Sequence, residues 1–380
     1  MLTIKGKSNS KKPTRNIKEK YKALFILHGL GDTIGFKNGE WEIMRKDVTL
    51  DIVNEFIYQF ITLGGVNGID LTDWNVSDDT LYHMATAKAM LKYDGKIDAN
   101  FNKHHKLAML DIFKQIDDEE NKKGINIRYT GYTTDKYIEK FTDKTDASHQ
   151  PYDPESGGNG CAMKMLCVGA CLHKKDQLNE LIDVSIRIGK MTHNSPIGFL
   201  GGLNSALFTM FAIEGVPISK WGFELIKILS SKQVKKHVDF ESLDEMNDYL
   251  TFIKQWKKYL KSRFKEGKLV ITKSHTNMML RIKYYHELLV KTTSSDAIGE
   301  SGFGACIMAY DCLLDSGGYW EKLIMYSGMH PGDSDTTCAI AGGWFGAIYG
   351  FSDTPKNLIE KLEYVDKLKN LGRDIYEKYH

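Results

Sequence analysis

Several features that would assign this chain to a particular class of protein are scarce or missing. Only 6 of its 380 residues are cysteine and no two of them form a CxxC pair, so a disulfide framework is not expected. We interpret these cysteines as buried small hydrophobic residues in a reducing compartment, with redox sensitivity or incidental metal binding as the alternative. A cytoplasmic location is expected on this ground.

Proline, charge of one sign and long apolar runs are also scarce. The chain has 7 prolines, and no stretch rich in Pro, Gly or Ser divides it. Its net charge of +2 gives no electrostatic argument for nucleic-acid binding. No apolar run approaches the length of a membrane span, and the polar start lacks the apolar core of a signal peptide. The composition is ordinary for a soluble globular protein, and we expect no nucleic-acid or membrane partner.

The chain begins with a basic segment. Residues 1–20 contain seven Lys or Arg against one acid, Glu19, and almost no apolar residue after Ile4. We predict a disordered, solvated tail there, with a weak targeting or nucleic-acid role as the alternative. Residues 21–380 show no internal repeat or linker, so we expect them to form a single domain.

The hydrophobic pattern of this domain is mostly helical. Apolar residues recur with a helix period along residues 178–188 and 243–264, and residues 205–213 are apolar enough for a core helix. The apolar run at residues 23–27 fits a strand or a buried helix, and the polar stretch 121–154 is expected to be a functional loop region. We therefore predict an all-α fold.

Two acidic clusters lie far apart in the chain, at Ser77-Asp78-Asp79-Thr80 and at Asp333-Ser334-Asp335-Thr336-Thr337. Each precedes a small-residue apolar stretch that predicts a helix, over residues 81–93 and 338–349. Carboxylates and hydroxyls without Cys or His suit Mg²⁺ or Mn²⁺, and if folding joins the clusters they can hold two ions about 3.5–4 Å apart. Helix capping alone is the alternative for each cluster. The glycines around the second cluster favour a tight site: Gly332, Gly342, Gly343 and Gly346.

Three further places carry candidate functional residues. Glu155-Ser156-Gly157-Gly158-Asn159-Gly160 precedes a helix expected near Cys161. Glycines before a helix N-terminus suit a phosphate or diphosphate, with a plain loop–helix junction as the alternative. Asp32-Thr33 is a third acid–hydroxyl pair or a simple turn. His193 lies between two expected helices and is interpreted as a structural hydrogen-bonding residue.

In combination these motifs resemble those of the ADP-ribosylglycohydrolases. The segments that follow the family's order are Gly31-Asp32-Thr33-Ile34-Gly35, Ser77-Asp78-Asp79-Thr80, Gly158-Asn159-Gly160-Cys161-Ala162-Met163 and Gly332-Asp333-Ser334-Asp335-Thr336. Asn38-Gly39-Glu40-Trp41-Glu42 and Lys361-Leu362-Glu363-Tyr364 are similar to the ADP-ribosylarginine hydrolase branch. The resemblance runs from about Tyr21 to the C-terminus.

The resemblance implies an all-α orthogonal helical bundle with a binuclear Mg²⁺ centre at the bottom of a cleft, Mn²⁺ being a substitute. It implies metal ligands at Ser77, Asp78, Asp79, Asp333, Asp335 and Thr336, acid/base roles for Asp78 and Asp79, a flap glutamate near the scissile bond at Glu42, and ADP-ribose contacts at Gly157, Gly158 and Asn159. The implied activity is hydrolysis of the N-glycosidic bond between ADP-ribose and arginine, in mono-ADP-ribosylated proteins or in ADP-ribosyl-arginine. A monomer is expected.

One segment departs from the pattern of the arginine branch. Residues 294–306 keep Ser301-Gly302 but lack the branch's aromatic residue and its His-Asp pair, which bears on adenosine contacts and on the leaving group. Hydrolysis of serine-linked or O-acetyl-ADP-ribose, and a catalytically silent ADP-ribose-binding or structural protein of the same fold, are therefore alternatives. A phosphatase with a DxDxT motif at Asp333, Asp335 and Thr337 is a third, although Gly332 and Pro331 precede the motif where a buried strand should end.

Overall fold

The structure is a computed structural model that describes residues 11–42, 50–141, 150–290 and 297–380. Helices make up almost all of its regular structure, and the two short strands form one antiparallel hairpin in which Phe264 pairs with Leu269. The prediction of an all-α fold is confirmed. The α-helices are α1 Ile17–Phe36, α2 Leu50–Thr62, α3 Gly65–Gly68, α4 Asp78–Met90, α5 Ala99–Lys123, α6 Tyr132–Ile138, α7 Leu166–Cys171, α8 Leu178–Lys190, α9 Pro196–Ile213, α10 Trp221–Leu229, α11 Lys232–Lys235, α12 Leu243–Arg263, α13 Lys273–Thr276, α14 Met278–Leu288, α15 Gly302–Ser316, α16 Trp320–Gly328, α17 Ser334–Tyr349, α18 Lys356–Lys361 and α19 Val365–Tyr379. The 3₁₀ helices are η1 Lys37–Gly39, η3 Lys175–Gln177 and η4 Ile218–Lys220, and the strands are β1 Phe264–Lys265 and β2 Lys268–Leu269.

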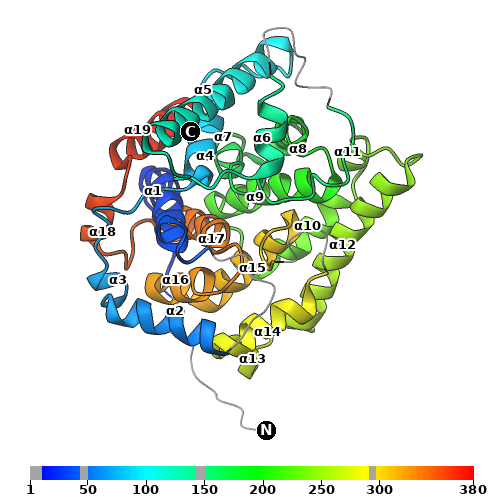
Figure 1. Cartoon of the computed structure of the whole chain (residues 1–380). Coiled ribbons are helices and arrows are strands. Elements are labelled where there is room, and N and C mark those ends of the chain that lie inside the picture. The colour runs from blue at the N-terminus through cyan, green and yellow to red at the C-terminus, as the bar shows by residue number, and fades with distance from the viewer. Residues whose placement is uncertain (1–10, 43–49, 142–149, 291–296) are drawn as a thin grey trace.

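The first and the seventeenth α-helix lie side by side and antiparallel in the interior (Figure 1). Their backbones touch at glycines: a Cβ on Gly31 would lie 2.3 Å from the Cys338 carbonyl oxygen, and one on Gly346 would lie 2.4 Å from that of Ala23. Glycine is therefore required for this close approach. Of the glycines that follow the second acidic cluster, Gly342 and Gly346 serve this helix contact and Gly343 leaves room for Leu166 of α7. None of them lines the cavity described below, which corrects the interpretation from sequence.

Helix α9 forms the apolar centre of the fold and packs against α7, α8, α15 and α17. All of its residues are buried. Among the described helices it alone is long and apolar enough to cross a membrane, so the expectation that no apolar run approaches that length is wrong. Length and composition are weak evidence for a span, and complete burial inside the protein is what a core helix shows.

The element boundaries differ from the predicted ones at the functional motifs. Residues 23–27, which fitted a strand or a helix, lie within α1. The helices after the two acidic clusters begin at Asp78 and Ser334, several residues earlier than predicted, so the clusters lie on the first turns. The helix expected near Cys161 begins only at Leu166, after a series of turns. The loop region contains α6, and residues 142–149 lie outside the described part.

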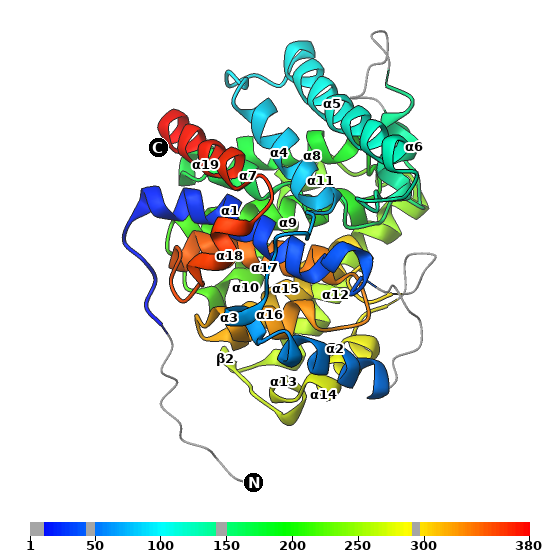
Figure 2. The ribbon, with the colours of Figure 1, turned by 60° about the vertical axis from the view of Figure 1, so that its left-hand side comes forward.

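The N-terminal segment is ordered where the structure describes it, which corrects the prediction of a disordered tail for residues 11–20. The backbone N–H groups of Lys11 and Thr14 donate to the carbonyl oxygens of Gly317 and Ile348, over 2.9 and 3.0 Å. Asn16 caps α1, which begins at Ile17 (Figure 2). Sequence composition missed these contacts because they are made mostly by backbone groups. Residues 1–10 lie outside the described residues.

Candidate active site

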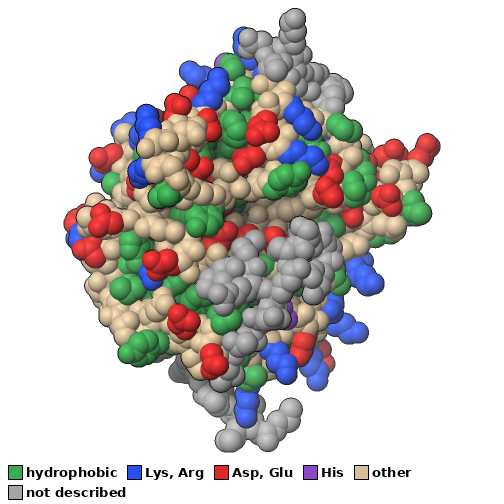
Figure 3. All heavy atoms as spheres, in the orientation of Figure 1, with side chains coloured by type: hydrophobic (Ala, Val, Ile, Leu, Met, Phe, Trp, Pro, Cys, Tyr) green, Lys and Arg blue, Asp and Glu red, His purple; other side chains and the backbone are tan. Residues whose placement is uncertain are grey.

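A cavity of about 640 Å³ opens at the N-termini of α4, α6 and α17. Figure 3 shows acidic side chains in the hollow near the middle of this face of the molecule. The cavity is lined by Glu42, Asp78, Asp79, Tyr129, Gly131, Tyr132, Thr133, Thr134, Pro154, Glu155, Gly158, Asn159, Gly160, Met163, His193, Glu300, Asp333, Asp335 and Thr336. Seven of these residues are acidic, and no lysine or arginine is among those that the structure describes at this surface.

The first acidic cluster is held by an acid from another helix, Asp32 of α1. Its carboxylate accepts hydrogen bonds from the backbone N–H groups of Ser77, at 3.1 Å, and Thr80, at 3.2 Å, and from the Thr80 hydroxyl. Burial raises the pKa of Asp32 to about 6, although these hydrogen bonds act in the opposite direction. Asp32 therefore orients the segment that carries Asp78 and Asp79.

The two acidic clusters meet in the folded chain. The Thr336 hydroxyl of α17 donates to Oδ1 of Asp79 over 3.3 Å, which joins residues 257 positions apart. Oδ2 of Asp79 is buried and has no hydrogen-bond partner among the described residues. Asp333 caps α17 by accepting from the Thr336 N–H, so capping and clustering occur together.

The electrostatics of the cluster follow from burial and like charge. The pKa values of Asp78, Asp79 and Asp335 are raised well above the usual range, first by burial and then by neighbouring carboxylates. Burial and the same carboxylates also raise the pKa of Glu42. Carboxylates this deeply buried are normally paired with a cation or protonated. A cation bound among them would keep them ionised.

The residues present suit a hard divalent cation by their chemistry. Carboxylate and hydroxyl oxygens are the ligands that Mg²⁺ prefers, and the unpartnered Oδ2 of Asp79 is an available donor. Within the described residues, however, no three His, Cys, Asp or Glu side chains are arranged as a ready-made ion site. The fit therefore rests on the donor set and on the uncompensated negative charge, and not on preformed coordination.

Residues 155–160, called the glycine loop below, are linked to the second acidic cluster through Asn159. Its side-chain amide donates to Oδ2 of Asp333 over 2.7 Å and to the Gly299 carbonyl over 2.9 Å. Its backbone N–H donates to the Glu300 carbonyl, and Gly158 forms a β-bridge with Ser301. The described end of the divergent segment, residues 297–306, thus forms one wall of the cavity.

The structure places most of the predicted site residues in one cavity. Those that line it are Glu42, Asp78, Asp79, Gly158, Asn159, Asp333, Asp335 and Thr336. Ser77 and Gly157 do not line it. The Ser77 hydroxyl accepts from the Asp79 N–H and caps α4, and the Gly157 carbonyl accepts from the Gly302 N–H. Their assigned roles as a metal ligand and as a ligand contact are the least supported by position.

Comparison with known proteins identifies the family. The family model for ADP-ribosylglycohydrolase matches residues 13–380. The chain belongs to the ADP-ribosylglycohydrolase family. The resemblance seen in the motifs is therefore confirmed, and a glycohydrolase acting on ADP-ribosylated substrates is the activity that this family supports.

Similar proteins of the ADP-ribosylglycohydrolase family come from distant organisms. ADP-ribosylhydrolase ARH1 of Dictyostelium discoideum is 32% identical over 94% of each chain. A protein of Acanthamoeba polyphaga mimivirus, provisionally named ADP-ribosyl glycohydrolase L444, is 33% identical over 92% of this chain and 68% of its own length. A solved structure described as an ADP-ribosylglycohydrolase-related protein complex has a TM-score of 0.60 over 97% of this chain and all of its own, at 14% identity, which supports the fold alone.

Several residues that line the cavity of this ADP-ribosylglycohydrolase, or that support its acidic clusters from behind, were not selected from sequence. Asp32 stood in a recognised motif but had a turn as its alternative, and His193 was interpreted as structural. Glu300 lies in the divergent segment, where no motif pointed to it. Tyr129 and Tyr132 lie in the loop region, and only the expectation of a functional loop could have indicated them.

Tyr129 has a backbone conformation that marks it as constrained. Its φ is 54°, a left-handed value that is uncommon for a bulky residue. Its ring lies edge-on to Phe36 at 5.3 Å and occupies the space where a Cβ on Gly39 would stand. The ring is therefore fixed in the cavity wall, beside the segment that leads to Glu42.

Proposed function

We propose that this protein is a Mg²⁺-dependent hydrolase that removes ADP-ribose from mono-ADP-ribosylated arginine side chains. The observation that carries the proposal is the meeting of the two acidic clusters in one cavity, within a chain similar over 94% of its length to a protein named ADP-ribosylhydrolase ARH1. The substrates would be ADP-ribosylated proteins or ADP-ribosyl-arginine.

Two Mg²⁺ ions, with Mn²⁺ as a substitute, would be held by Ser77, Asp78, Asp79, Asp333, Asp335 and Thr336. The Ser77 hydroxyl oxygen uses one lone pair to accept from the Asp79 N–H and has a second one for an ion. When bound, such ions neutralise the carboxylates and polarise the oxygens of the ribose and of water. The donor chemistry and the raised pKa values of the carboxylates support this assignment.

The protein's own carboxylates suit the chemistry of the N-glycosidic bond. Water adds to C1″ of the ribose as the bond from C1″ to the guanidinium nitrogen breaks, and Asp78 or Asp79 accepts the proton of that water. The transition state has oxocarbenium character, which nearby negative charge stabilises. Glu42 lies in the cavity wall, and we assign to it a role near the scissile bond.

The entrance of the cavity favours a cationic leaving group. Tyr129 and Tyr132 present aromatic rings there, and Glu155 is an exposed acid on the same surface. A guanidinium stacks on aromatic rings and pairs with carboxylates. Because it carries a positive charge before cleavage, it departs as neutral guanidine, whereas a serine oxygen departs only with a proton supplied.

The first prediction tests the linkage that is cleaved. Matched peptides carrying ADP-ribose on arginine or on serine are incubated with the protein, and release of ADP-ribose is measured with Mg²⁺ and with excess EDTA. The arginine-linked peptide should be cleaved about 10²-fold faster or more, because it needs no general acid. Equal or reversed rates would contradict the arginine assignment in favour of serine-linked substrates. O-acetyl-ADP-ribose is tested in the same assay, and no release from any of the three would indicate a catalytically silent binding protein.

The second prediction tests the metal. Asp335→Asn should lower the rate of ADP-ribose release about 10²-fold or more, as expected for loss of a major electrostatic group. Mg²⁺ should raise the Tm of the wild type by binding to the folded state, and should raise that of Asp335→Asn much less. Asp117→Asn, an exposed position on α5, is the control and should behave as the wild type. Full activity in excess EDTA would show that the clusters are helix caps and nothing more.

A further inference from the structure

Lys164 is a charged side chain enclosed in the interior. It lies in the turns between the glycine loop and α7, and none of its surface is exposed. Its Nζ donates to the hydroxyl of Thr192 over 2.9 Å. Lysine is almost never fully buried unless it is paired, because removing its charge from water is costly. Nothing in the proposed reaction explains this lysine.

The hydroxyl of Thr192 connects Lys164 to a residue at the cavity. Oγ1 of Thr192 lies 2.9 Å from Nδ1 of His193, the next residue in the chain. Because the Lys164 ammonium has donors only, Thr192 accepts from it and keeps its own hydroxyl proton to donate. The nearby Sγ of Cys161 is a weak acceptor, whereas an imidazole nitrogen is a strong one. We assign the proton of Thr192 to the hydrogen bond with Nδ1 of His193, the stronger of the two acceptors.

The other ring nitrogen of His193 lies beside the glycine loop at the cavity. A Cβ on Gly160 would stand 2.8 Å from Nε2 of His193, and one on Gly158 would stand 3.7 Å from it. The ring thus occupies space that only glycine leaves open, and His193 lines the cavity with both glycines. With Nδ1 accepting from Thr192, a neutral ring carries its proton on Nε2.

We propose that Lys164 and Thr192 are positioning residues that hold His193 in the neutral form with its proton on Nε2, as a hydrogen-bond donor for a phosphate oxygen beside the glycine loop. The identity of the ligand, the diphosphate of ADP-ribose, rests on the proposed function. The hydrogen-bond chain from Lys164 Nζ through Thr192 Oγ1 to His193 Nδ1 does not.

The charge distribution of the cavity explains why such a device is useful. Seven acidic residues line the cavity, and the described lining residues include no lysine or arginine, yet the diphosphate is itself anionic. The neutral His193 ring would donate its Nε2–H to the diphosphate, and the buried ammonium of Lys164 lies behind the ring. Neither group forms an ion pair with the carboxylates of the acidic clusters. The pKa of His193 is held well below its ordinary value by burial and by the charge of Lys164, which keeps the ring neutral.

The experiment measures which ring nitrogen of His193 carries the proton. Nitrogen NMR of histidine-labelled protein distinguishes the two neutral forms, and the spectrum of His193→Gln assigns the signal. The wild type should show the proton on Nε2. Thr192→Val removes the hydroxyl and keeps the shape, and Lys164→Met removes the charge, so both should give a mixture of forms. Lys164→Arg retains a cationic donor and should restore the wild-type form.

The same variants are then tested for ADP-ribose binding by calorimetry. Thr192→Val and Lys164→Met should raise the Kd about tenfold, the effect of one hydrogen bond of about 1.4 kcal/mol. Lys20→Met is the matched control, because Lys20 is also buried but donates to the carbonyl oxygens of Ala212 and Ile213, away from the cavity. It should leave the signal of His193 and the Kd unchanged.

Two results separate the proposal from the function on which it rests. An unchanged form of His193 and an unchanged Kd in folded Thr192→Val and Lys164→Met would overturn the positioning role. A wild type that binds no ADP-ribose would contradict the proposed function. The NMR measurement needs no ligand and would still decide whether Lys164 and Thr192 fix the ring.

Discussion

Two aspartates in this structure have the same burial and opposite roles. The Asp32 carboxylate accepts from two backbone N–H groups and a hydroxyl, so its oxygens are occupied by the protein. Asp79 has one oxygen with a weak partner and another with none within the described part of the chain. A carboxylate saturated by the chain is structural, whereas one with an orphaned oxygen is available for a ligand. Sequence places both in acid–hydroxyl motifs and cannot separate them.

His28 shows a second consequence of burial at the scale of one residue. It lies one helical turn before Asp32 and is fully buried, with its ring 4.2 Å from that of His83. Its Nε2–H donates to the Met163 carbonyl over 2.8 Å. Burial lowers its pKa from 6.5 to about 4, so the folded state binds no proton there at pH 5.

The third prediction follows from this shift. Between pH 6.5 and about 4 the unfolded chain takes up a proton at His28 that the folded chain does not, so stability present above pH 6.5 is lost as the pH falls. His28→Gln keeps a donor for Met163 and does not titrate. The wild type should therefore lose about 3 kcal/mol more unfolding free energy than the variant over this range. Denaturant unfolding at several pH values measures it, and parallel pH profiles would contradict it.

At the scale of elements, the helices followed from periodicity but their starts did not. Residues 178–188 and 243–264 were predicted to be helical because their apolar faces repeat, and α8 and α12 confirm this. Helix α4 begins at Asp78 because Ser77 caps it and Asp32 accepts from Thr80. Such a start depends on a contact with another helix, which a local pattern does not contain.

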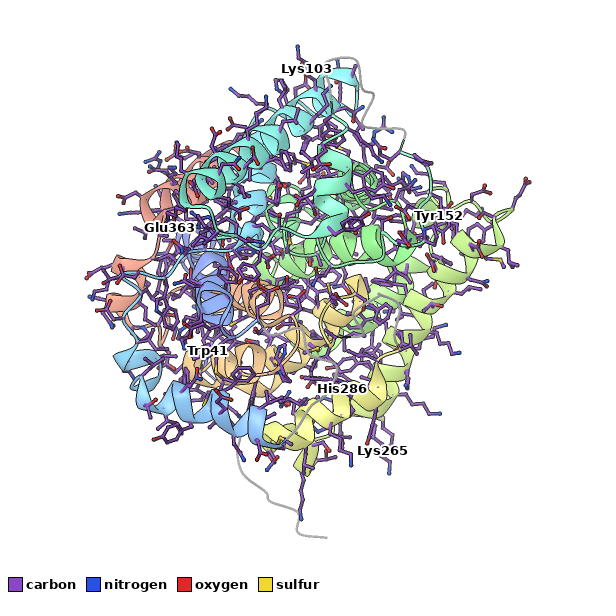
Figure 4. All side chains as sticks on the ribbon, viewed as in Figure 1. Trp41, Lys103, Tyr152, Lys265, His286 and Glu363 are labelled. Carbon is purple, nitrogen blue, oxygen red and sulfur yellow. The ribbon has the colours of Figure 1, made fainter. Side chains whose placement is uncertain are left out.

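The segment before α4 is held by a tether from the C-terminal region. The guanidinium of Arg128 donates to the Val76 carbonyl over 2.8 Å and to both carboxylate oxygens of Glu363 over 2.7 and 2.9 Å. Glu363 also accepts from the Val76 N–H, and the Asp78 N–H donates to the Arg128 carbonyl. Figure 4 labels Glu363, which lies between α18 and α19.

The fourth prediction tests this tether. Glu363→Ala should destabilise the fold by about 1–3 kcal/mol, since the Val76 N–H loses its acceptor and the buried Arg128 keeps only one of its two carboxylate partners, Glu119 at 2.9 Å. It should also raise the Mg²⁺ concentration needed for half-maximal activity, because the segment carrying Asp78 loosens. The control is Lys361→Ala, which breaks an exposed ion pair with Asp70 at 2.7 Å on the same segment and should leave the stability nearly unchanged. A Mg²⁺ requirement that is equal in both variants would assign Glu363 to stability alone.

At the scale of the whole molecule, local sequence patterns could not predict that the two acidic clusters lie close together. Each cluster alone predicts a helix cap, and Ser77 and Asp333 do cap α4 and α17. Their meeting depends on the antiparallel contact of α1 with α17, which places Asp32 near both clusters. The family resemblance predicted that the clusters form one site. Glu300 and Tyr129 belong to irregular segments, and only the complete fold brings them to the cavity.

The N-terminal segment also acts at this scale, because it joins parts of the chain that are distant in sequence. Lys11 pairs with Asp353 at 2.5 Å, and Thr14 binds the backbone at the end of α17. Lys11 and Pro13 line a second cavity of about 370 Å³, whose other walls include Val216, Leu313 and Tyr349. Removing the segment would expose this apolar surface to water.

The fifth prediction compares two truncations. Deletion of residues 1–10 should leave the Tm unchanged, whereas deletion of residues 1–15 should lower it by about 1–3 °C. The longer deletion removes an ion pair, two backbone hydrogen bonds and an apolar cover, together of order 1–2 kcal/mol. The rate of ADP-ribose release at 20 °C should be the same for both, because the two cavities share no lining residue. Equal Tm values would show that residues 11–15 add no stability despite their contacts. A selective loss of rate in the longer deletion would instead connect this face of the molecule to the active site.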